Sequence, residues 1–372
     1  MSTRNRFAIA IAAAALLAAQ DGGRSSVKVN LSADSPVLLL SAGWGESRTS
    51  ERGSASILNL NTALSLRNSS NRRIRAISWM VSSQEVTPGG RASVTRASLD
   101  IAPGEAFPLR VDLRLLRPLG KGPEPAVEMS LDGVLFDDLS FFGPNRLDSR
   151  RVMTAFEMEA QRDRRYLQQV LQASGPDGLK KECLQSLARQ AELPRLNVTL
   201  ARSGRSTATD PEREVRWSFL NFPGSPVEPV AGMARVSGGE ARAPRLEVHN
   251  RSKQEVRYLE VGWILQDWRG REFLAGAVPA KANLAPGANA EVLQRTSLEF
   301  AEPGGGPISV ESLTGFVSQV EFADGKIWIP TRAELADPKL LRALVPSAEE
   351  QRLTGIYRRK GVQALIEELK KF

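Results

Sequence analysis

Very few side chains in this sequence could carry out acid–base or nucleophilic catalysis. The 372 residues include one histidine, His249, and one cysteine, Cys183. A Ser-His-Asp or Cys-His arrangement would have to use His249, and no Gly-x-Ser-x-Gly pattern surrounds a serine. A transition-metal site of the usual composition needs several histidine or cysteine ligands. We therefore assign no catalytic residue, no cofactor or cofactor-binding residue and no metal ligand.

Paired carboxylates are the remaining route to catalysis, since two acids can hydrolyse glycosides without a histidine. Two adjacent pairs are present, Asp137 with Asp138 and Glu349 with Glu350. Adjacent side chains point to opposite faces of a strand and lie about 100° apart on a helix, so neither pair alone aims two acids at one sugar. We expect loop or capping roles. A carboxylate-dependent enzyme or accessory subunit acting on cell-wall polymers stays as the alternative function.

Three further features could suggest chemistry. The glycine clusters "GWGE" at Gly43 and "PGGGP" at Gly304 lack the Lys-Ser/Thr of a phosphate loop and are expected to be turns. Cys183 lies in "LKKECLQSLARQ", whose leucine spacing predicts a helix, and the two preceding lysines could lower the pKa of its thiol. A half-buried structural cysteine and an intermolecular disulfide are the alternatives.

The N-terminus has the layout of a secretory signal peptide over residues 1–19. Arg4 and Arg6 precede an uncharged apolar stretch from Phe7 to Ala19. As a helix this stretch reaches roughly 20 Å, short of the roughly 30 Å of a bilayer core. We expect cleavage after Ala19, an extracytoplasmic chain, periplasmic or secreted, and no membrane span in the mature protein. An uncleaved anchor, giving a membrane-tethered accessory factor, is the alternative.

Charge and composition restrict the partners. The formal charge of +8 falls to +6 when the two arginines of the signal segment leave, and the basic residues are spread along the chain. Export and the lack of any nucleic-acid-binding signature argue against nucleic acid. We expect a protein or an anionic envelope polymer as partner. Candidate contacts for phosphates or polymers are four arginine doublets, Arg72 and Arg73, Arg150 and Arg151, Arg164 and Arg165, and Arg358 and Arg359.

The most informative feature is an internal repeat. "LSLRNSSNRRIRAISWMV" from Leu64 matches "LEVHNRSKQEVRYLEVGWIL" from Leu246, so that Asn68 falls on Asn250 and His249 on Arg67. We expect His249 at an exposed strand position for this reason. Two further blocks follow in the same order, Pro103-Gly104 with Pro286-Gly287 and Asp132-Gly133 with Asp324-Gly325. The repeat predicts a duplicated unit and two domains.

Within each copy the local pattern is typical of β-strands. Apolar residues alternate at Ile77, Trp79 and Val81, and again from Leu259 through Val261 and Trp263. Pro-Gly pairs mark turns, and the two Asp-Gly pairs predict hairpins. Short strands with regular turns indicate a mainly β fold of two β-sandwiches.

These blocks resemble extracytoplasmic immunoglobulin-like modules, and the FxLYD-type group in particular. The resemblance covers residues 64–115 and 246–298, through an Asn-Ser turn leading into an alternating strand and then a Pro-Gly turn. The chain lacks the aromatic-aspartate signature of that group, which "ILQDWRGREF" matches only approximately. The resemblance implies an immunoglobulin-like sandwich and no particular function.

Helical segments are expected after each sandwich. Asp148 or Ser149 is a candidate N-cap, Gly175-Pro176 a helix stop, and a second helix is predicted over 178–191. Near the C-terminus Asp337 precedes Pro338, and "SAEE" from Ser347 to Glu350 fits a capping box. The expected organisation is a signal peptide at 1–19, sandwiches at 27–145 and 195–333, a helical connector at 148–192 and a helical segment at 337–372.

The helical segments and the aromatic residues leave partner binding open. The helices either pack back onto their own module or dock another protein in a groove, with Val362, Leu365, Ile366 and Leu369 on one face. Trp79 and Trp263 are expected in the core, and Phe141 and Phe142 at the first junction. Candidate surface anchors are Trp44, Trp217 and Trp268. We conclude that the sequence predicts a non-catalytic interaction or structural protein.

Overall fold

The computed structural model describes residues 26–83, 89–118, 126–192, 194–202, 211–294, 296–304, 306 and 308–372. The predicted signal segment, residues 1–19, lies outside this range. The chain is mainly β with helical segments, as the alternating pattern predicted. It divides into two compact units, Met1–Glu157 and Met158–Phe372. We call them unit 1 and unit 2 and describe each by itself.

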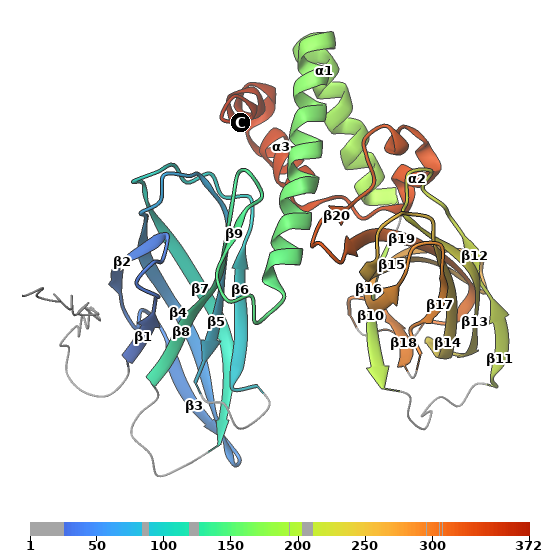
Figure 1. Ribbon diagram of the computed structural model, residues 1–372, viewed down its shortest axis with the longest axis horizontal. Helices are drawn as coiled ribbons and strands as arrows, with labels where there is room; N and C mark the ends of the chain where they lie inside the picture. The colour runs from blue at the N-terminus through green and yellow to red at the C-terminus, as the bar shows by residue number, and fades with distance from the viewer. Residues whose placement is uncertain are drawn as a thin grey trace, which may run out of the picture. The chain divides into compact units, whose positions relative to one another are not determined.

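Unit 1 contains two β-sheets. The first has the strand order β1-β8-β5-β6, with β9 added to β8 (Figure 1). In the second sheet β4 is the central strand, with β2 and β3 on one side and β7 on the other. The strands are β1 (Ser26–Asn30), β2 (Val37–Ala42), β3 (Arg48–Arg52), β4 (Ala55–Asn68), β5 (Ile74–Ser82), β6 (Arg91–Arg96), β7 (Ala106–Pro118), β8 (Ala126–Phe136) and β9 (Phe141–Phe142).

Period-two patterning explains why the two sheets of unit 1 share one core. Along β4, Leu60, Leu64 and Leu66 are buried while the residues between them are exposed or polar. They belong to the same hydrophobic cluster as Trp79 of β5 and Met129 of β8. Each sheet therefore buries one face against the other.

Unit 2 is a single curved sheet that closes into a near-barrel (Figure 1). Its strand order is β11-β13-β14-β18-β10-β16-β15-β19-β12, with β17 on β14 and β20 on β19. The strands are β10 (Arg195–Arg202), β11 (Arg213–Arg216), β12 (Ser218–Phe219), β13 (Val227–Ser237), β14 (Glu240–Asn250), β15 (Val256–Asp267), β16 (Glu272–Leu284), β17 (Asn289–Val292), β18 (Thr296–Ala301), β19 (Val310–Phe322) and β20 (Ile327–Trp328).

Two short segments close this sheet. β10 runs parallel to β16 at Arg195 and Leu196, and its remaining residues pair antiparallel with β18. On the other side β11 pairs with β13 and β12 with β19, with only Trp217 between them. The predicted second sandwich is therefore more closed than expected, because strands from the segment at 195–219 join its two layers.

Trp217 is a core residue, so its prediction as a surface anchor was wrong. Its side chain is 7% exposed, and its ring meets Trp263 edge to face with centroids 4.8 Å apart. A Cβ at Gly232 would lie 2.2 Å from the Trp217 ring, so glycine is required for this approach. Trp79 and Trp263 are fully buried, as predicted.

The strand neighbours of unit 1 recur in unit 2. β5 lies between β6 and β8, and β15 lies between β16 and β19. β4 pairs with β2 and β7, while β14 pairs with β13 and β17. The parallel pairs also correspond, since β1 joins β8 and β12 joins β19.

A buried asparagine at the end of β4 and of β14 makes the same hydrogen bonds in both units. Asn68 donates through Nδ2 to the carbonyls of Arg72 (2.8 Å) and Ile101 (3.1 Å). Its Oδ1 accepts from the backbone N–H (3.0 Å) and hydroxyl (2.7 Å) of Ser70.

In unit 2, Asn250 donates to the carbonyls of Gln254 (2.8 Å), Leu284 (2.9 Å) and Ala285 (3.1 Å). Its Oδ1 accepts from the N–H (3.0 Å) and hydroxyl (2.7 Å) of Ser252. Both asparagines are fully buried. The sequence match of Asn68 with Asn250 therefore corresponds to one turn structure formed twice.

The third repeated block has a different register from the one predicted. Asp324-Gly325 forms the turn between β19 and β20, as expected, with Gly325 at φ 80°. Asp132-Gly133 lies inside β8 and forms no hairpin. The equivalent turn of unit 1 contains Asp138 and Leu139, where Leu139 adopts φ 63°. The absence of glycine from this turn is why the sequence pattern pointed to the wrong pair.

The helices follow their predicted limits closely. α1 (Ser149–Glu192) is broken at Gly175, which adopts φ 65° and is followed by Pro176. A short 3₁₀ turn at Glu334–Ala336 precedes α2 (Pro338–Ala343), which Asp337 caps by accepting from the N–H of Lys339. α3 (Ala348–Leu369) is interrupted at Gly361.

The apolar faces of the helices are occupied within the units. In unit 1, Met153 of α1 packs with Ala76 and Leu135. In unit 2, the apolar face of α3 predicted from residues 362–369 packs against Leu167, Leu179 and Cys183 of α1. α2 packs on Phe222 and Phe316 of the second unit. Packing thus accounts for these faces, although α3 covers another helix and not a sheet.

No helix in the described part of the chain combines the length and the apolar content that a bilayer crossing requires.

Removing the buried asparagine should destabilise each unit strongly. In Asn68→Ala and Asn250→Ala, the bonded carbonyls lose a donor and a buried side chain is truncated. We expect a decrease of about 2–4 kcal/mol in the free energy of unfolding. Asn59→Ala, at an exposed position of β4, is the matched control and should change little. Urea denaturation of the three variants measures the effect, and equal stability of Asn68→Ala and the control would refute the role of the turn.

Candidate functional site

The first acid pair, Asp137 and Asp138, serves the turn between β8 and β9. Oδ1 of Asp138 accepts from the N–H of Ser140 (2.9 Å) and from its hydroxyl. These hydrogen bonds, helped by Arg72, lower the pKa of Asp138. Asp137 takes part through its backbone N–H, which donates to Arg73. The pair therefore has the loop role expected from the sequence.

The second acid pair lies in the first turn of α3 and is held by arginines. Glu349 is 1% exposed and contacts Arg164 of α1 (3.3 Å) and Arg352 of its own helix (2.8 Å). The hydrogen bonds that the Arg352 guanidinium donates to Glu349 raise the pKa of Arg352. Because two cations share this carboxylate, its charge is compensated inside the unit.

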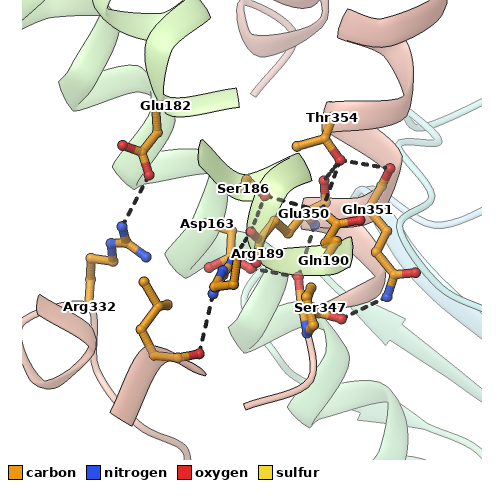
Figure 2. A network of polar contacts seen from close by, with 12 residues as sticks. Asp163, Glu182, Ser186, Arg189, Gln190, Arg332, Ser347, Glu350, Gln351 and Thr354 are labelled. Carbon is orange, nitrogen blue, oxygen red and sulfur yellow. Dashed lines mark hydrogen bonds and ion pairs between the residues drawn. The ribbon is translucent and has the colours of Figure 1, made fainter. Parts of the chain in front are cut away.

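Glu350 lies in a network of polar contacts between α1 and α3 (Figure 2). It accepts hydrogen bonds from Ser186 and Arg189, both on the second half of α1. Ser347 accepts from the N–H of Glu350 (3.0 Å), which confirms the predicted N-cap. The Glu350 carboxylate, however, bonds α1 in place of returning to Ser347, so the capping box is only half formed.

Further contacts continue the network on both sides (Figure 2). The Ser347 hydroxyl donates to Asp163 of α1 (2.6 Å), and Gln190 donates to Thr354 of α3 (3.3 Å). Arg332, after β20, contacts Glu182 at 3.4 Å. We call the residues labelled in Figure 2, together with Glu349, Arg164 and Arg352, the helix network.

The helix network was difficult to predict from the sequence. Its charged residues are spaced along helices whose other faces are polar and exposed, so each resembles a solvated side chain. Only the helical periodicity of the flanking apolar residues, such as Leu167 and Leu179, could have placed Arg164 and Asp163 next to the buried stripe.

Glu159 of α1 is a half-buried carboxyl group. Burial raises its pKa to about 7; Arg162 opposes the shift, while the charges of Asp163 and Glu260 add to it. A carboxyl group that titrates near neutrality can exchange a proton, so Glu159 is the candidate acid or base that sequence reasoning missed.

Cys183 and His249 have structural surroundings. Cys183 is fully buried against α3, and burial raises the pKa of its thiol to about 11. This supports a structural cysteine and contradicts the thiol activation inferred from the neighbouring lysines. His249 lies on β14, where its Nδ1 is 2.6 Å from Oδ1 of Asn289, so it occupies the partly exposed strand position that the repeat predicted.

The other candidate aromatics divide between surface and junction. Trp268 is 65% exposed, with the Arg269 guanidinium 4.6 Å from its ring centroid. Trp44 packs partly on the core of unit 1 and donates to the carbonyl of Ser47 (3.1 Å). Phe141 and Phe142 pack beside β8, at the expected junction.

Several arginines of the doublets are used inside the units. Arg72 lies over the Phe136 ring at 3.7 Å, and Arg73 pairs with Asp100 at 2.8 Å. Arg164 belongs to the helix network. Arg358 and Arg359 are exposed on α3.

The glycine cluster at Gly43 can be compared with its prediction, whereas the cluster at Gly304 lies partly outside the described residues. Gly45 adopts φ 62° in a tight turn against β4, in agreement with the predicted turn at Gly43. A shallow groove lies along a single helix, lined by Asp177, Lys180, Lys181, Leu184, Gln185 and Ala188. In the part of the chain that the structure describes, no three acidic, histidine or cysteine side chains gather as metal ligands would.

Comparison with known proteins leaves the chain without a family. No family model matches it, and no curated protein matches it. A β-glucosidase from Kluyveromyces marxianus aligns with 71% of this chain at 9% identity and a TM-score of 0.14, and this chain covers 46% of that protein. A mutant hydroxyethylphosphonate dioxygenase aligns with 70% of this chain and 76% of its own at 10% identity and a TM-score of 0.10. Scores this low carry no inference about fold or function.

Neutralising Glu349 should loosen the attachment of α3 to α1. In Glu349→Gln the buried guanidinium of Arg164 loses this carboxylate, while Arg352 keeps its pair with Glu368. We expect a loss of about 3 kcal/mol in the free energy of unfolding. Limited proteolysis should also cleave α3 faster. Glu367→Gln, an exposed position of the same helix that pairs with Lys370, should behave like the parent. Equal proteolysis rates for both variants would contradict the role of Glu349.

Glu159 should make the stability of the chain fall as the pH rises. Its pKa is about 7 in the folded chain against an ordinary value of 4.5, so between these values only the folded state keeps the proton. Glu159→Gln removes this proton uptake and should be more stable than the parent at pH 8 by about 1–3 kcal/mol, with little difference at pH 4.

Denaturation at the two pH values measures this difference. Glu51→Gln, in exposed β3, controls for the loss of one negative charge. A stability difference between Glu159→Gln and the parent that does not change with pH would show that Glu159 ionises normally.

Proposed function

We propose that this chain is a non-catalytic interaction or structural protein that works outside the cytoplasm, built from a duplicated immunoglobulin-like unit with helical segments. One observation carries the proposal: the acids that could have formed a catalytic pair are engaged by their own structure. Asp138 caps a turn, and Glu349 and Glu350 bind α1. These carboxylates stabilise the fold, and their geometry leaves none of them paired toward a substrate.

The duplication part of the proposal is supported by hydrogen bonds and strand neighbours. Asn68 with Ser70 and Asn250 with Ser252 form matching turns. The strand pairings of unit 1 have counterparts in unit 2: β4 with β7 corresponds to β14 with β17, and β5 with β8 corresponds to β15 with β19. Layered units of this kind present strand faces and edges as binding surfaces, which suits an interaction role.

The location outside the cytoplasm is supported by the sequence of residues 1–19, whose basic start and apolar stretch fit a signal peptide. Expression in a host with a secretory pathway tests it. We expect the mature protein to begin at Gln20, as read by N-terminal sequencing. A chain that keeps Met1 and stays in the cytoplasm would refute this part alone.

The alternative is a carboxylate-dependent enzyme acting on cell-wall polymers, and Glu159 is the observation that favours it. A neutral carboxyl group near pH 7 can act as a general acid. Purified protein should be incubated with glycans and peptidoglycan, with and without divalent metal, and the products measured. We expect no turnover. Turnover that Glu159→Gln abolishes, while Glu51→Gln does not, would establish the enzyme and overturn our proposal.

A further inference from the structure

The outer face of the β4 sheet in unit 1 carries exposed arginines, four of which lie at or between the levels of Asn59 and Arg67. On β4 the residues Asn59, Asn61, Ser65 and Arg67 point away from the core, alternating with buried leucines. On β7, Arg114 lies opposite Asn59 of β4, and Arg110 lies opposite Ala63. On the other side of β4, Arg48 of β3 also lies opposite Asn59. Residues directly opposite each other share a face. We call Arg48, Arg67, Arg110 and Arg114 the basic face.

The arginines of the basic face are spaced regularly because the strands are. Arg114 and Arg48 flank β4 on either side, so their Cα atoms lie about 10 Å apart. Arg110 and Arg114 are four residues apart on β7, or about 14 Å along the strand. The four guanidinium groups therefore belong to three neighbouring strands, and asparagine and serine side chains of β4 lie between these arginines.

No carboxylate of the described residues lies within ion-pair distance of any of these four arginines. Asp112, the acid on this face, lies between Arg110 and Arg114 on β7 and opposite Asn61. The face therefore keeps an excess of positive charge, whose mutual repulsion opposes folding. An anionic partner would relieve that repulsion.

The corresponding face of unit 2 shows that the fold does not require these arginines. His249 occupies the position of Arg67, immediately before the buried asparagine, and Glu247 that of Ser65. There the polar groups satisfy one another: His249 is 2.6 Å from Asn289, which donates to Glu247 at 2.8 Å. At these two positions unit 2 therefore has hydrogen-bonded side chains where unit 1 has Arg67 and Ser65.

We propose that the basic face of unit 1 binds a linear anionic polysaccharide, one whose carboxylates meet the arginines while its hydroxyls bond Asn59, Asn61 and Ser65. This deepens the proposed function and rests on it. Guanidinium groups pair with carboxylates through two parallel hydrogen bonds, and the amides between them can both donate to and accept from sugar hydroxyls.

The chemistry of the face favours a polysaccharide over other polyanions. Single-stranded nucleic acids are bound with aromatic side chains on which bases stack, and the outward residues of β4 between Asn59 and Arg67 include no aromatic side chain. Duplex DNA is read by an element that enters a groove, whereas these arginines are spread across the face of a sheet. Insertion into a membrane needs an apolar surface. The exposed leucines of this face, Leu38 opposite Arg67 and Leu116 on β7, lie at its two ends, with Asn59, Asn61 and Ser65 between them.

Polygalacturonate of defined length is the probe, with its fully methyl-esterified form as the uncharged counterpart. Binding of both to the purified full chain should be measured by titration calorimetry at low and at physiological ionic strength. We expect binding of the charged polymer only, weakened by salt. The quadruple variant R48Q/R67Q/R110Q/R114Q should lose about tenfold or more in affinity.

The matched control removes four exposed arginines elsewhere, in R216Q/R257Q/R358Q/R359Q. It should bind within about twofold of the parent, and equal melting temperatures must show that both variants fold. Unchanged affinity of the first variant would overturn the basic face while leaving the proposed function intact. The basic face would also be overturned if the esterified polymer bound equally well or if neither polymer bound. Tighter binding of duplex DNA or of anionic vesicles through the same four arginines would overturn it too. Shortening of the polymer would instead contradict the proposed function.

Discussion

The layered structure of both units depends on satisfying backbone carbonyls where the chain turns between sheets. A carbonyl group that faces the protein instead of water needs a donor, and each unpaired group would oppose folding. Asn68 and Asn250 resolve this by donating to carbonyls from two separate segments and accepting from the serine two residues on. The bonds thereby fix how the chain passes from β4 to β5 and from β14 to β15, strands that do not pair with each other.

The units differ in how their sheets end. Unit 2 gains β10, which follows β16 and then β18, and the pair β11 and β12 on the opposite side. Closure removes free strand edges, which would otherwise pair with other chains. In the described part of unit 1, β6 and β7 pair only with β5 and β4. Open edges and an uncompensated basic face make unit 1 the part of the chain more suited to contacts with other molecules.

The helical part of unit 2 combines two kinds of interaction. Apolar residues such as Leu179 and Leu365 form a small core between α1 and α3, and arginine–carboxylate pairs surround it. Pairs of this type give less net stability than their geometry suggests, because both charges lose hydration. Their directionality does fix which faces meet. The C-terminal helix is therefore positioned by Glu349 and Glu350 as well as by its leucines.

Features that depend on local periodicity and turn chemistry were predictable from the amino-acid sequence. These include the mainly β fold, the breaks at Gly175 and after Ala336, the core positions of Trp79 and Trp263, and the matching of Asn68 with Asn250. Tertiary structure decided what depends on partners distant in the chain. Trp217 became buried because β13 approaches it, and the turn at Asp138 replaced the one predicted at Asp132. Glu349 pairs with Arg164. The arginines of β3, β4 and β7 lie on one face without a carboxylate partner among the described residues. Such encounters depend on strand register and helix packing, which contacts between segments far apart in the sequence set.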